Sequence, residues 1–242
     1  MGSATVRRLL RQFCKVGIWD INQTLGSAMA TELGPNAHFV QCDVSSPQSV
    51  NTALNSTLQA FSRVDVLVNC AGIIEFIPTY SKETGMHPLE AFDKMMKVNL
   101  YGTFNTCRLI ARHMVKQQPR EGERGVIINT SSISGTEGAK GQTAYSATKG
   151  AIIGMTLPMA RDLGAFGIRV ATIAPGLFLT PMSAPAPKEA LDSFAGASSL
   201  GRGGDPDEFA HTVQFIIENT YVTGSVFRID GGTRIPHTYS AS

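Results

Sequence analysis

Residues 126–149 read VIINTSSISGTEGAKGQTAYSATK, and this stretch decides the fold. It opens on the apolar run 126–130, which fits a strand covered on both faces of a sheet. A turn containing Ser132 follows, and then Tyr145 and Lys149 stand four residues apart, a spacing that puts them on one face of a helix. The stretch therefore predicts a buried strand, a turn and a crossover helix.

The same alternation of strand and helix extends in both directions along the chain. Short runs typical of strands occur at residues 16–19, 38–42, 64–69, 126–130, 168–174 and 225–229. Between them, Ser46-Pro47 and Asp205-Pro206 are typical of helix starts, because proline tolerates the first helical turn. Strand, helix and strand in sequence predict right-handed crossovers and a parallel sheet.

The whole chain, residues 1–242, is predicted to form one doubly wound α/β domain of the Rossmann type, because no repeat or linker divides it. Its least regular stretch is 178–204, rich in proline, alanine, serine and glycine. A loop of that length in a compact domain is usually a lid or a binding loop. We therefore expect 178–204 to form a substrate-binding loop.

Composition excludes several classes of protein. Hydrophobic residues make up 43% of the 242 residues and charged residues 17%, which suits a folded core and not a disordered chain. The 21 basic and 19 acidic residues are too nearly balanced to indicate a nucleic-acid partner. The four cysteines and five histidines show no metal-binding spacing, so we expect no metal site and no disulfide framework. No apolar run is long enough to span a membrane.

The first nineteen residues allow two interpretations. They carry four basic residues and no acid, a pattern typical of a mitochondrial presequence. They also place Val6, Leu9, Leu10 and Phe13 at helical spacing ahead of the strand 16–19, which indicates a structural helix. The regular alternation of the remaining chain favours the helix.

Ser132, Tyr145 and Lys149 carry the clearest chemical signal. An ammonium group on the same helix face as a phenol can lower the pKa of that phenol, which suits general acid–base catalysis. A serine at a strand's carboxyl end can bind a carbonyl or alkoxide oxygen. The tyrosine-lysine spacing alone also fits a surface tyrosine and a solvated lysine, but the serine at the strand end favours a site.

Four further motifs lie at strand ends or in helices. Asn69-Cys70-Ala71-Gly72 and Pro175-Gly176 each follow an apolar strand, where small residues let a backbone approach a ligand; each also fits an ordinary turn. Asn99 lies in an apolar helical pattern, and a satisfied core asparagine is the alternative there. Asp20, at the end of the first strand, could accept hydrogen bonds from a ribose 2′-hydroxyl.

In this order, the motifs resemble the short-chain dehydrogenase/reductase family over the whole chain. The resemblance rests on NCAG at 69–72, which stands for the family's NNAG, and on Asn99, Ser132, Tyr145 with Lys149, and Pro175-Gly176. Other segments, which are not among the motifs common to the whole family, resemble one subfamily, whose members oxidise the 3-hydroxyl of fatty acyl-CoA. These segments include 161–163, 167–170, 172–178 and 216–219.

The resemblance implies NAD-dependent oxidation of a secondary alcohol, with steroids and other small alcohols as further substrates. It implies that Tyr145 takes the hydroxyl proton, that Lys149 lowers the tyrosine pKa and holds the nicotinamide ribose, that Ser132 orients the substrate oxygen, and that Asn99 holds a water. The cofactor-binding residues it implies are Asp20, Asp43, Val44, Cys70, Ala71, Gly72, Tyr145, Lys149, Pro175, Gly176, Phe178 and Thr180. It further implies a homotetramer and a mitochondrial location, with the cytoplasm as the alternative.

One departure from the family concerns the N-terminus. The family opens with a strand and a TGxxxGxG turn, whereas here Met1-Gly2 leads directly into the basic segment. Gly2 lies 18 residues before Asp20, close to the separation in a dinucleotide fingerprint. We therefore expect that the first strand and its glycine turn are missing, which weakens the pyrophosphate site. This leaves a second hypothesis, a catalytically silent subunit that keeps the family's association surfaces.

Overall fold

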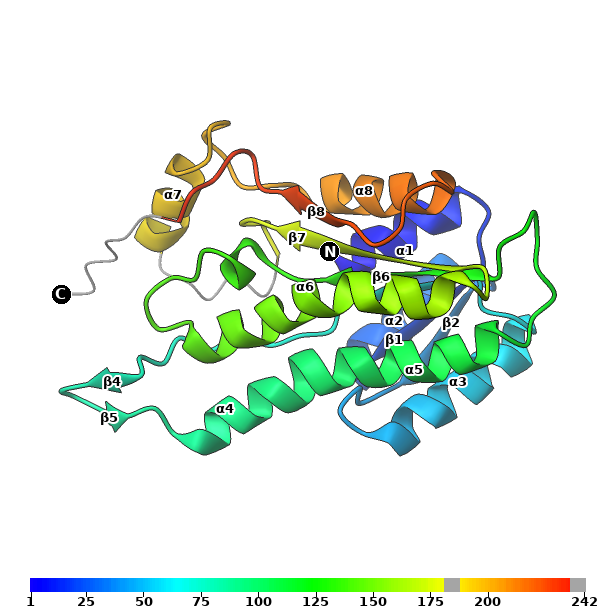
Figure 1. Cartoon of the computed structure of the whole chain (residues 1–242), viewed down its shortest axis with the longest axis horizontal. Coiled ribbons are helices and arrows are strands. Elements are labelled where there is room, and N and C mark those ends of the chain that lie inside the picture. The colour runs from blue at the N-terminus through cyan, green and yellow to red at the C-terminus, as the bar shows by residue number, and fades with distance from the viewer. Residues whose placement is uncertain (181–187, 236–242) are drawn as a thin grey trace.

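The computed structural model describes residues 1–180 and 188–235 and confirms the alternating α/β organisation (Figure 1). The strands are β1 (Val16–Asp20), β2 (Ala37–Gln41), β3 (Val66–Asn69), β4 (Tyr80–Ser81), β5 (Gly85–Met86), β6 (Gly125–Thr130), β7 (Ile168–Pro175) and β8 (Val226–Ile229). The α-helices are α1 (Gly2–Arg11), α2 (Gln23–Leu33), α3 (Pro47–Phe61), α4 (Leu89–Met95), α5 (Gly102–Met114), α6 (Thr143–Gly164), α7 (Lys188–Gly196) and α8 (Pro206–Glu218). A π-helical segment, η1 (Met96–Tyr101), joins α4 to α5, and a 3-10 turn, η2 (Ile133–Gly135), follows β6.

All six predicted strands form, and their pairing is parallel, but they lie in two ladders. One ladder has the order β3-β6-β7-β8, and β1 pairs with β2 in the other. Within the described residues, β1 pairs only with β2 and β3 only with β6, so each keeps one edge outside any ladder. The strands that end at Asp20 and Asn69 are therefore not joined to each other. The short antiparallel hairpin β4-β5 is separate from both ladders.

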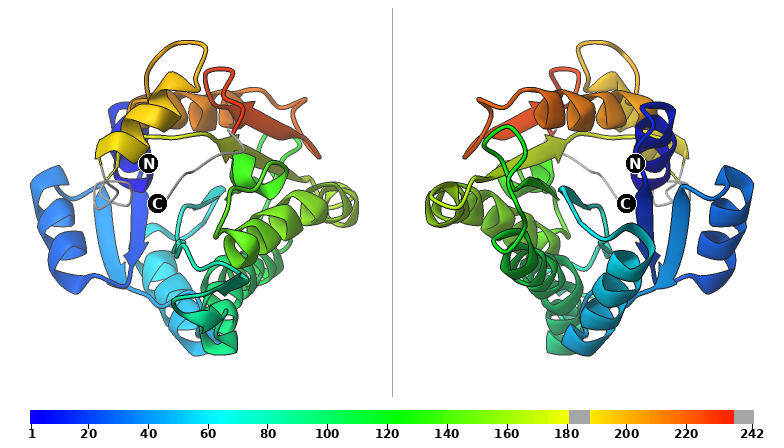
Figure 2. Two further views of the ribbon diagram at one scale, coloured as in Figure 1. Left: turned by 90° about the vertical axis from the view of Figure 1, so that its left-hand side faces the viewer. Right: turned by 90° about the vertical axis from the view of Figure 1, so that its right-hand side faces the viewer.

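Helices cover both faces of the larger ladder (Figures 1 and 2). On one face, Ile127 of β6 and Val170 of β7 pack in a cluster with side chains of α3, α5 and α6. On the other, Ile128 of β6 and Ile173 of β7 pack against Phe209 and further side chains of α8. Successive strand residues point to opposite faces, which explains why these strands are apolar throughout. The core confirms the expected strands buried on both faces.

The basic N-terminal segment is a helix that packs on α8. Arg8 and Arg11 lie 3.5 and 3.2 Å from the carboxylate of Asp207, in the first turn of α8. The hydrophobic pattern predicts a helix that reaches Phe13, but the helix ends at Arg11. Phe13 lies beyond that end in a left-handed conformation and is 93% exposed, so its assignment to the apolar face was wrong.

The two predicted helix starts are confirmed by their caps. Ser46 accepts a hydrogen bond from the backbone N–H of Ser49, and Pro47 begins α3. At α8, the carboxylate of Asp205 accepts from the N–H of Asp207, while Glu208 accepts from the N–H of Asp205. These bonds satisfy N–H groups that have no partner within the helix.

The loop expected over 178–204 lies partly outside the described residues, at 181–187. Its described part is more regular than the sequence indicates, because α7 occupies Lys188–Gly196. Its two ends meet: the N–H of Leu179 donates to the carbonyl of Gly204 at 3.1 Å, and the N–H of Gly204 to that of Leu177 at 2.9 Å. The loop thus begins and ends beside the carboxyl end of β7. Across the described residues, no helix is both long and apolar enough to cross a membrane.

Candidate functional site

Ser132 lies in the turn between β6 and α6, where its hydroxyl accepts from the N–H of Ser134 at 3.1 Å and caps η2. Ser132 is buried, with 8% of its surface exposed. Tyr145 stands in the first turn of α6, where burial raises the pKa of its phenol and a hydrogen bond with the Ser132 hydroxyl offsets part of that rise. The turn therefore brings the predicted serine and tyrosine together.

Tyr145 and Lys149 share one face of α6, as predicted, with the Lys149 Nζ 5.6 Å from the centre of the tyrosine ring. Lys149 is buried and donates to the carbonyl oxygen of Thr130 at 2.9 Å. Burial lowers the pKa of Lys149 to about 8, because it disfavours the charged ammonium. The pKa of Tyr145 is raised, chiefly by burial. In this structure the lysine binds a backbone carbonyl, and its lowering of the tyrosine pKa stays a prediction.

Asn99 lies within the π-helical segment and is fully buried. Its side chain accepts from the N–H of Ile73 at 2.8 Å and donates to the carbonyl of Ile73 at 2.9 Å. A further bond joins it to the hydroxyl of Thr148 at 3.2 Å. The amide thus holds the segment after β3 in place. Both side-chain N–H hydrogens are used, so any water that Asn99 binds would have to donate to its side-chain oxygen or to its main-chain carbonyl, which already accepts from Thr103.

The segment Cys70-Ala71-Gly72 runs directly past the buried lysine. A Cβ at Gly72 would lie 3.3 Å from the Asn99 Oδ1 and 3.7 Å from the Lys149 Nζ, so this position favours glycine. The Cys70 thiol accepts from the Thr130 hydroxyl at 3.9 Å, and burial raises its pKa. Burial also lowers the pKa of the α-amino group of Met1, which interacts with Cys70.

The predicted adenosine residues lie at the ends of the smaller ladder. Asp20 is exposed, and one of its carboxylate oxygens accepts from the N–H of Asn22 at 2.8 Å. Asp43 accepts from the N–H and hydroxyl of Ser45 at 2.9 and 2.7 Å. The carbonyl of Val44 accepts from the Asn105 side chain at 3.3 Å. All of them lie at carboxyl ends of parallel strands, where ligands of open α/β sheets bind.

Pro175 ends β7, and Gly176 begins the turn that follows it. The N–H of Gly176 donates to the carbonyl of Ile229 at 3.0 Å, and a Cβ at Gly176 would lie 2.8 Å from that of Asp230. Phe178 is buried at 7% exposure, and Thr180 is the last described residue before 181–187. This turn therefore lies against the loop after β8.

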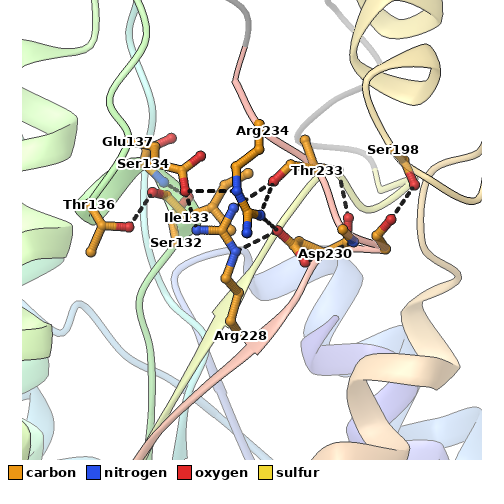
Figure 3. A network of polar contacts seen from close by, with 12 residues as sticks. Ser132, Ile133, Ser134, Thr136, Glu137, Ser198, Arg228, Asp230, Thr233 and Arg234 are labelled. Carbon is orange, nitrogen blue, oxygen red and sulfur yellow. Dashed lines mark hydrogen bonds and ion pairs between the residues drawn. The ribbon is translucent and has the colours of Figure 1, made fainter.

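One group of charged residues at this edge was missed by sequence reasoning. Glu137, Arg228 and Asp230 form ion pairs between the Ser132 turn and the loop after β8 (Figure 3). The signal available in the sequence is the run Arg228-Ile229-Asp230-Gly231-Gly232 at the end of the last strand. The spacing of residues in the sequence does not indicate that Arg228 pairs with Glu137, which lies 91 residues away. No group of three metal-ligating side chains occurs among the residues that the structure describes.

A parallel α/β sheet with serine, tyrosine and lysine at its carboxyl edge defines a nicotinamide-dependent dehydrogenase or reductase. Residues 1–234 match the family model described as enoyl-(acyl carrier protein) reductase, and the chain belongs to the short-chain dehydrogenase/reductase family. It is 48% identical to the 3-hydroxyacyl-CoA dehydrogenase type-2 of Homo sapiens over 238 residues, which cover 97% of this chain and 91% of that protein.

Two further relatives bear on the fold and on the substrate. The crystal structure of 3-hydroxyacyl-CoA dehydrogenase type-2 from Mycobacterium avium superposes with a TM-score of 0.90 at 40% identity, over 98% of this chain and 92% of that one. The 3-alpha-(or 20-beta)-hydroxysteroid dehydrogenase of Mycobacterium tuberculosis strain H37Rv is 36% identical, over 96% of this chain and 85% of that protein. The chain is thus a short-chain oxidoreductase related to 3-hydroxyacyl-CoA dehydrogenase type-2, and its family implies NAD or NADP.

The residues at the sheet edge fit much of such a dinucleotide. Gly72 leaves a surface that a Cβ would fill, beside the buried ammonium of Lys149. Asp20 presents a solvent-exposed carboxylate suited to a ribose diol.

Proposed function

We propose that this protein is an NAD-dependent oxidoreductase that interconverts a secondary alcohol and a ketone, with 3-hydroxyacyl-CoA and 3-ketoacyl-CoA as the pair. The observation that carries the proposal is the contact between Ser132 and Tyr145 one helical turn from the buried Lys149. Similarity to 3-hydroxyacyl-CoA dehydrogenase type-2 supports the acyl-CoA substrate. The hydroxysteroid relative supports steroids and other small alcohols as further substrates.

In the proposed reaction Tyr145 takes the proton of the substrate hydroxyl as its general base. NAD, when bound, supplies the acceptor for the hydride. The single hydroxyl hydrogen of Ser132 favours the tyrosinate when it is donated to Tyr145, and it would be donated to the substrate oxygen once substrate is bound. Lys149, with a pKa of about 8, can carry a positive charge beside the phenol at neutral pH and hold the nicotinamide ribose. Asn99 would bind a water through its carbonyl group.

The cofactor would lie along the carboxyl edge of both ladders. Asp20 would bind the adenosine ribose, Asp43 and Val44 the adenine, and Cys70, Ala71 and Gly72 the middle of the molecule. The nicotinamide would meet the segment from Pro175 to Thr180, including Gly176 and Phe178. The segment 178–204 would close over the substrate, since its ends meet beside β7.

We further propose that the active form is a homotetramer located in mitochondria, with the cytoplasm as the alternative location. Exposed apolar side chains support self-association: Tyr101 and Phe104 at the start of α5, and Leu157 on α6, are 58%, 47% and 46% exposed. Light scattering should give four times the 25.9 kDa of one chain. A monomer at micromolar concentration would contradict the tetramer.

A silent, structural subunit is the second candidate. The observation in its favour is that, among the described residues, β1 and β3 each keep one edge outside any ladder. Calorimetric titration with NAD separates the two candidates, because a silent subunit binds none.

The test of the proposed activity is NADH formation from a 3-hydroxyacyl-CoA at saturating NAD, with the Tyr145→Phe variant as the control. Turnover in the unaltered chain and its loss in the variant support the enzyme. Equal NADH formation in both would contradict the assignment of Tyr145, and NADH formation in neither would favour the silent subunit.

A further inference from the structure

Arg228 of β8 is the centre of a polar network beside the Ser132 turn (Figure 3). Its guanidinium donates to the carboxylate of Asp230 through Nε, to that of Glu137 through Nη1 and to the carbonyl of Thr233 through Nη2, each at 2.6 Å. The planar fork of an arginine can serve three such acceptors at fixed angles, which a lysine cannot do. Arg228 therefore fixes the relative positions of three acceptors in two separate loops.

The first of these loops carries Ser132. Glu137 closes the turn after β6, since its N–H donates to the carbonyl of Ile133 at 2.9 Å. Within the same turn, the N–H of Ser134 donates to the Ser132 hydroxyl. The turn is also pressed against α6, because a Cβ at Gly135 would lie 2.9 Å from the backbone of Lys149. Holding Glu137 therefore holds the turn that orients Ser132 on Tyr145.

The second loop, Asp230 to Thr233, touches the rest of the candidate site. Its start lies against Gly176, as described above, on the proposed nicotinamide side. Gly231 and Gly232 both have positive φ, at 61° and 76°, and a Cβ on either would lie within 2.6 Å of the hydroxyl of Ser198 or Ser199. The carbonyl of Gly231 accepts from the N–H of Ser199 at 2.8 Å. The loop thus also contacts the segment that follows α7.

The charges of the network are matched and partly shielded from solvent. The side chains of Arg228, Glu137 and Asp230 are 29%, 30% and 8% exposed. Arg234 adds a second guanidinium 3.8 Å from both carboxylates. Hydrogen bonding to Arg228 is the main reason that the pKa of Glu137 is lowered. Partly buried networks in which one guanidinium serves several acceptors hold geometry better than exposed pairs do.

We propose that Arg228 is a positioning residue of the active site, which through Glu137 and Asp230 sets the place of the Ser132 hydroxyl relative to Tyr145 and to the turn at Gly176. This inference rests on the proposed function. Arg228 acts through other residues and need not touch the substrate. A small displacement of a reacting group can cost on the order of a hundredfold in rate, so the network matters for turnover as well as for folding.

The test compares Arg228→Gln and Glu137→Gln with the unaltered chain in NAD-dependent alcohol oxidation, at NAD concentrations far above the dissociation constant. Each variant should lower kcat by roughly tenfold or more. Each should also move the rising limb of the kcat/KM–pH profile, which reports the enzyme before substrate binds, to higher pH, since in that state the Ser132 hydroxyl lowers the pKa of Tyr145 and would be displaced. Lys149 is the charged group that faces the tyrosine from the same helix, and neither substitution alters it. Ser132→Ala removes the hydroxyl itself and therefore gives the largest expected shift of this limb, against which the shifts of the two variants are compared.

Arg169→Gln is the matched control. Arg169 is likewise paired with a glutamate, Glu123, at 2.7 Å, and it is buried, but it lies at the start of β7, the opposite end of the strand from Gly176. It should lower the melting temperature without moving the pH limb. A merely structural role for Arg228 predicts the same for Arg228→Gln, and this result would overturn the inference. If Arg228→Gln does not fold, Glu137→Gln, which keeps an acceptor for Arg228, decides the matter alone. Lack of turnover in the unaltered chain would instead overturn the proposed function, and the inference with it.

Discussion

Tyr145 is the residue on which the proposed chemistry depends most directly. Replacing it by phenylalanine removes the titrating hydroxyl and keeps the ring, which is partly buried next to Ser132. General acid–base catalysis contributes roughly two to four orders of magnitude, so we expect kcat to fall by about that factor. The dissociation constant for NAD, followed by the fluorescence of Trp19 beside Asp20, should change little. Near-normal turnover would rule out Tyr145 as the base.

Asp20 is expected to select NAD over NADP. Its exposed carboxylate would repel a 2′-phosphate, and Asn22 satisfies only one of its oxygens. Asp20→Ala should therefore reduce the ratio of the dissociation constant for NADP to that for NAD. Glu32→Ala, which removes an exposed acid on α2, is the control and should leave this ratio unchanged. Tighter binding of NADP than of NAD by the unaltered chain would contradict this role.

Lys149 gives the stability of the fold a pH dependence. Its folded-state pKa, about 8, lies below the ordinary value of 10.5, so the unfolded chain binds this proton more tightly. Relative to Lys149→Met, the unaltered chain should gain unfolding free energy as the pH rises from 8 to 10.5, by about 3 kcal/mol, and show no further change below pH 8. Urea titrations of both chains across this range measure the difference. Parallel pH curves would contradict the burial of a titrating lysine.

At this scale, spacing along the sequence predicted which side chains share a helix face better than it predicted their polar partners. Spacing brought Tyr145 and Lys149 to one helix face, and both are there. Spacing could not predict that the ammonium binds the carbonyl of Thr130, because that contact depends on how β6 meets α6. For the same reason Arg228 and Glu137, which are 91 residues apart in sequence, were not recognised as partners.

At the scale of elements, the side chain of Asp205 caps the N-terminus of α8 and so sets where this helix begins. Asp205→Ala removes the oxygen that accepts from the N–H of Asp207. Loss of such a cap costs about 1 kcal/mol, so the urea midpoint should fall accordingly. Asp192→Ala, an exposed acid on α7, serves as the control and should cost less. An unchanged midpoint in Asp205→Ala would show that the cap is redundant with the packing of α8.

Elements with local signals were predicted well, and those that depend on tertiary contacts were not. Ser46 and Asp205 mark their helices by their own side chains, so both starts were identified. Helix α1 ends in local backbone bonds, from the N–H of Phe13 to the carbonyl of Leu10 and from that of Cys14 to the carbonyl of Leu9, with Phe13 in a left-handed conformation that a sequence would signal by glycine. Helix α7 was expected to be part of a loop, because alanine, serine and glycine fit either state. The role of 178–204 as a lid stays a prediction.

At the scale of the whole molecule, the two ladders raise the question of what lies between β1 and β3. Both strands keep an edge outside any ladder, and both end at residues of the candidate cofactor site, Asp20 and Asn69. Backbone N–H and C=O groups that are buried without partners cost free energy. A further parallel strand between them would satisfy these groups and would end beside the N-terminus of α1.

We therefore expect that extending this chain at its N-terminus by one strand and a TGxxxGxG turn raises both its melting temperature and its affinity for NAD. The strand would pair with β1 and β3, and the turn would supply N–H donors to the pyrophosphate. Each hydrogen bond to a charged group contributes about 1.5–3 kcal/mol, so two of them would tighten NAD binding by ~100-fold or more.

Calorimetry on the chain with and without the extension measures the NAD affinity, and thermal melts measure the stability. An extension of equal length with the turn glycines replaced by alanine is the matched control: it should recover the melting temperature in part and the NAD affinity hardly at all, because alanine is strained where the turn needs positive φ. Equal affinity and equal melting temperature with and without the extension would mean that β1 and β3 need no strand between them, and that α1 by itself suffices for the pyrophosphate.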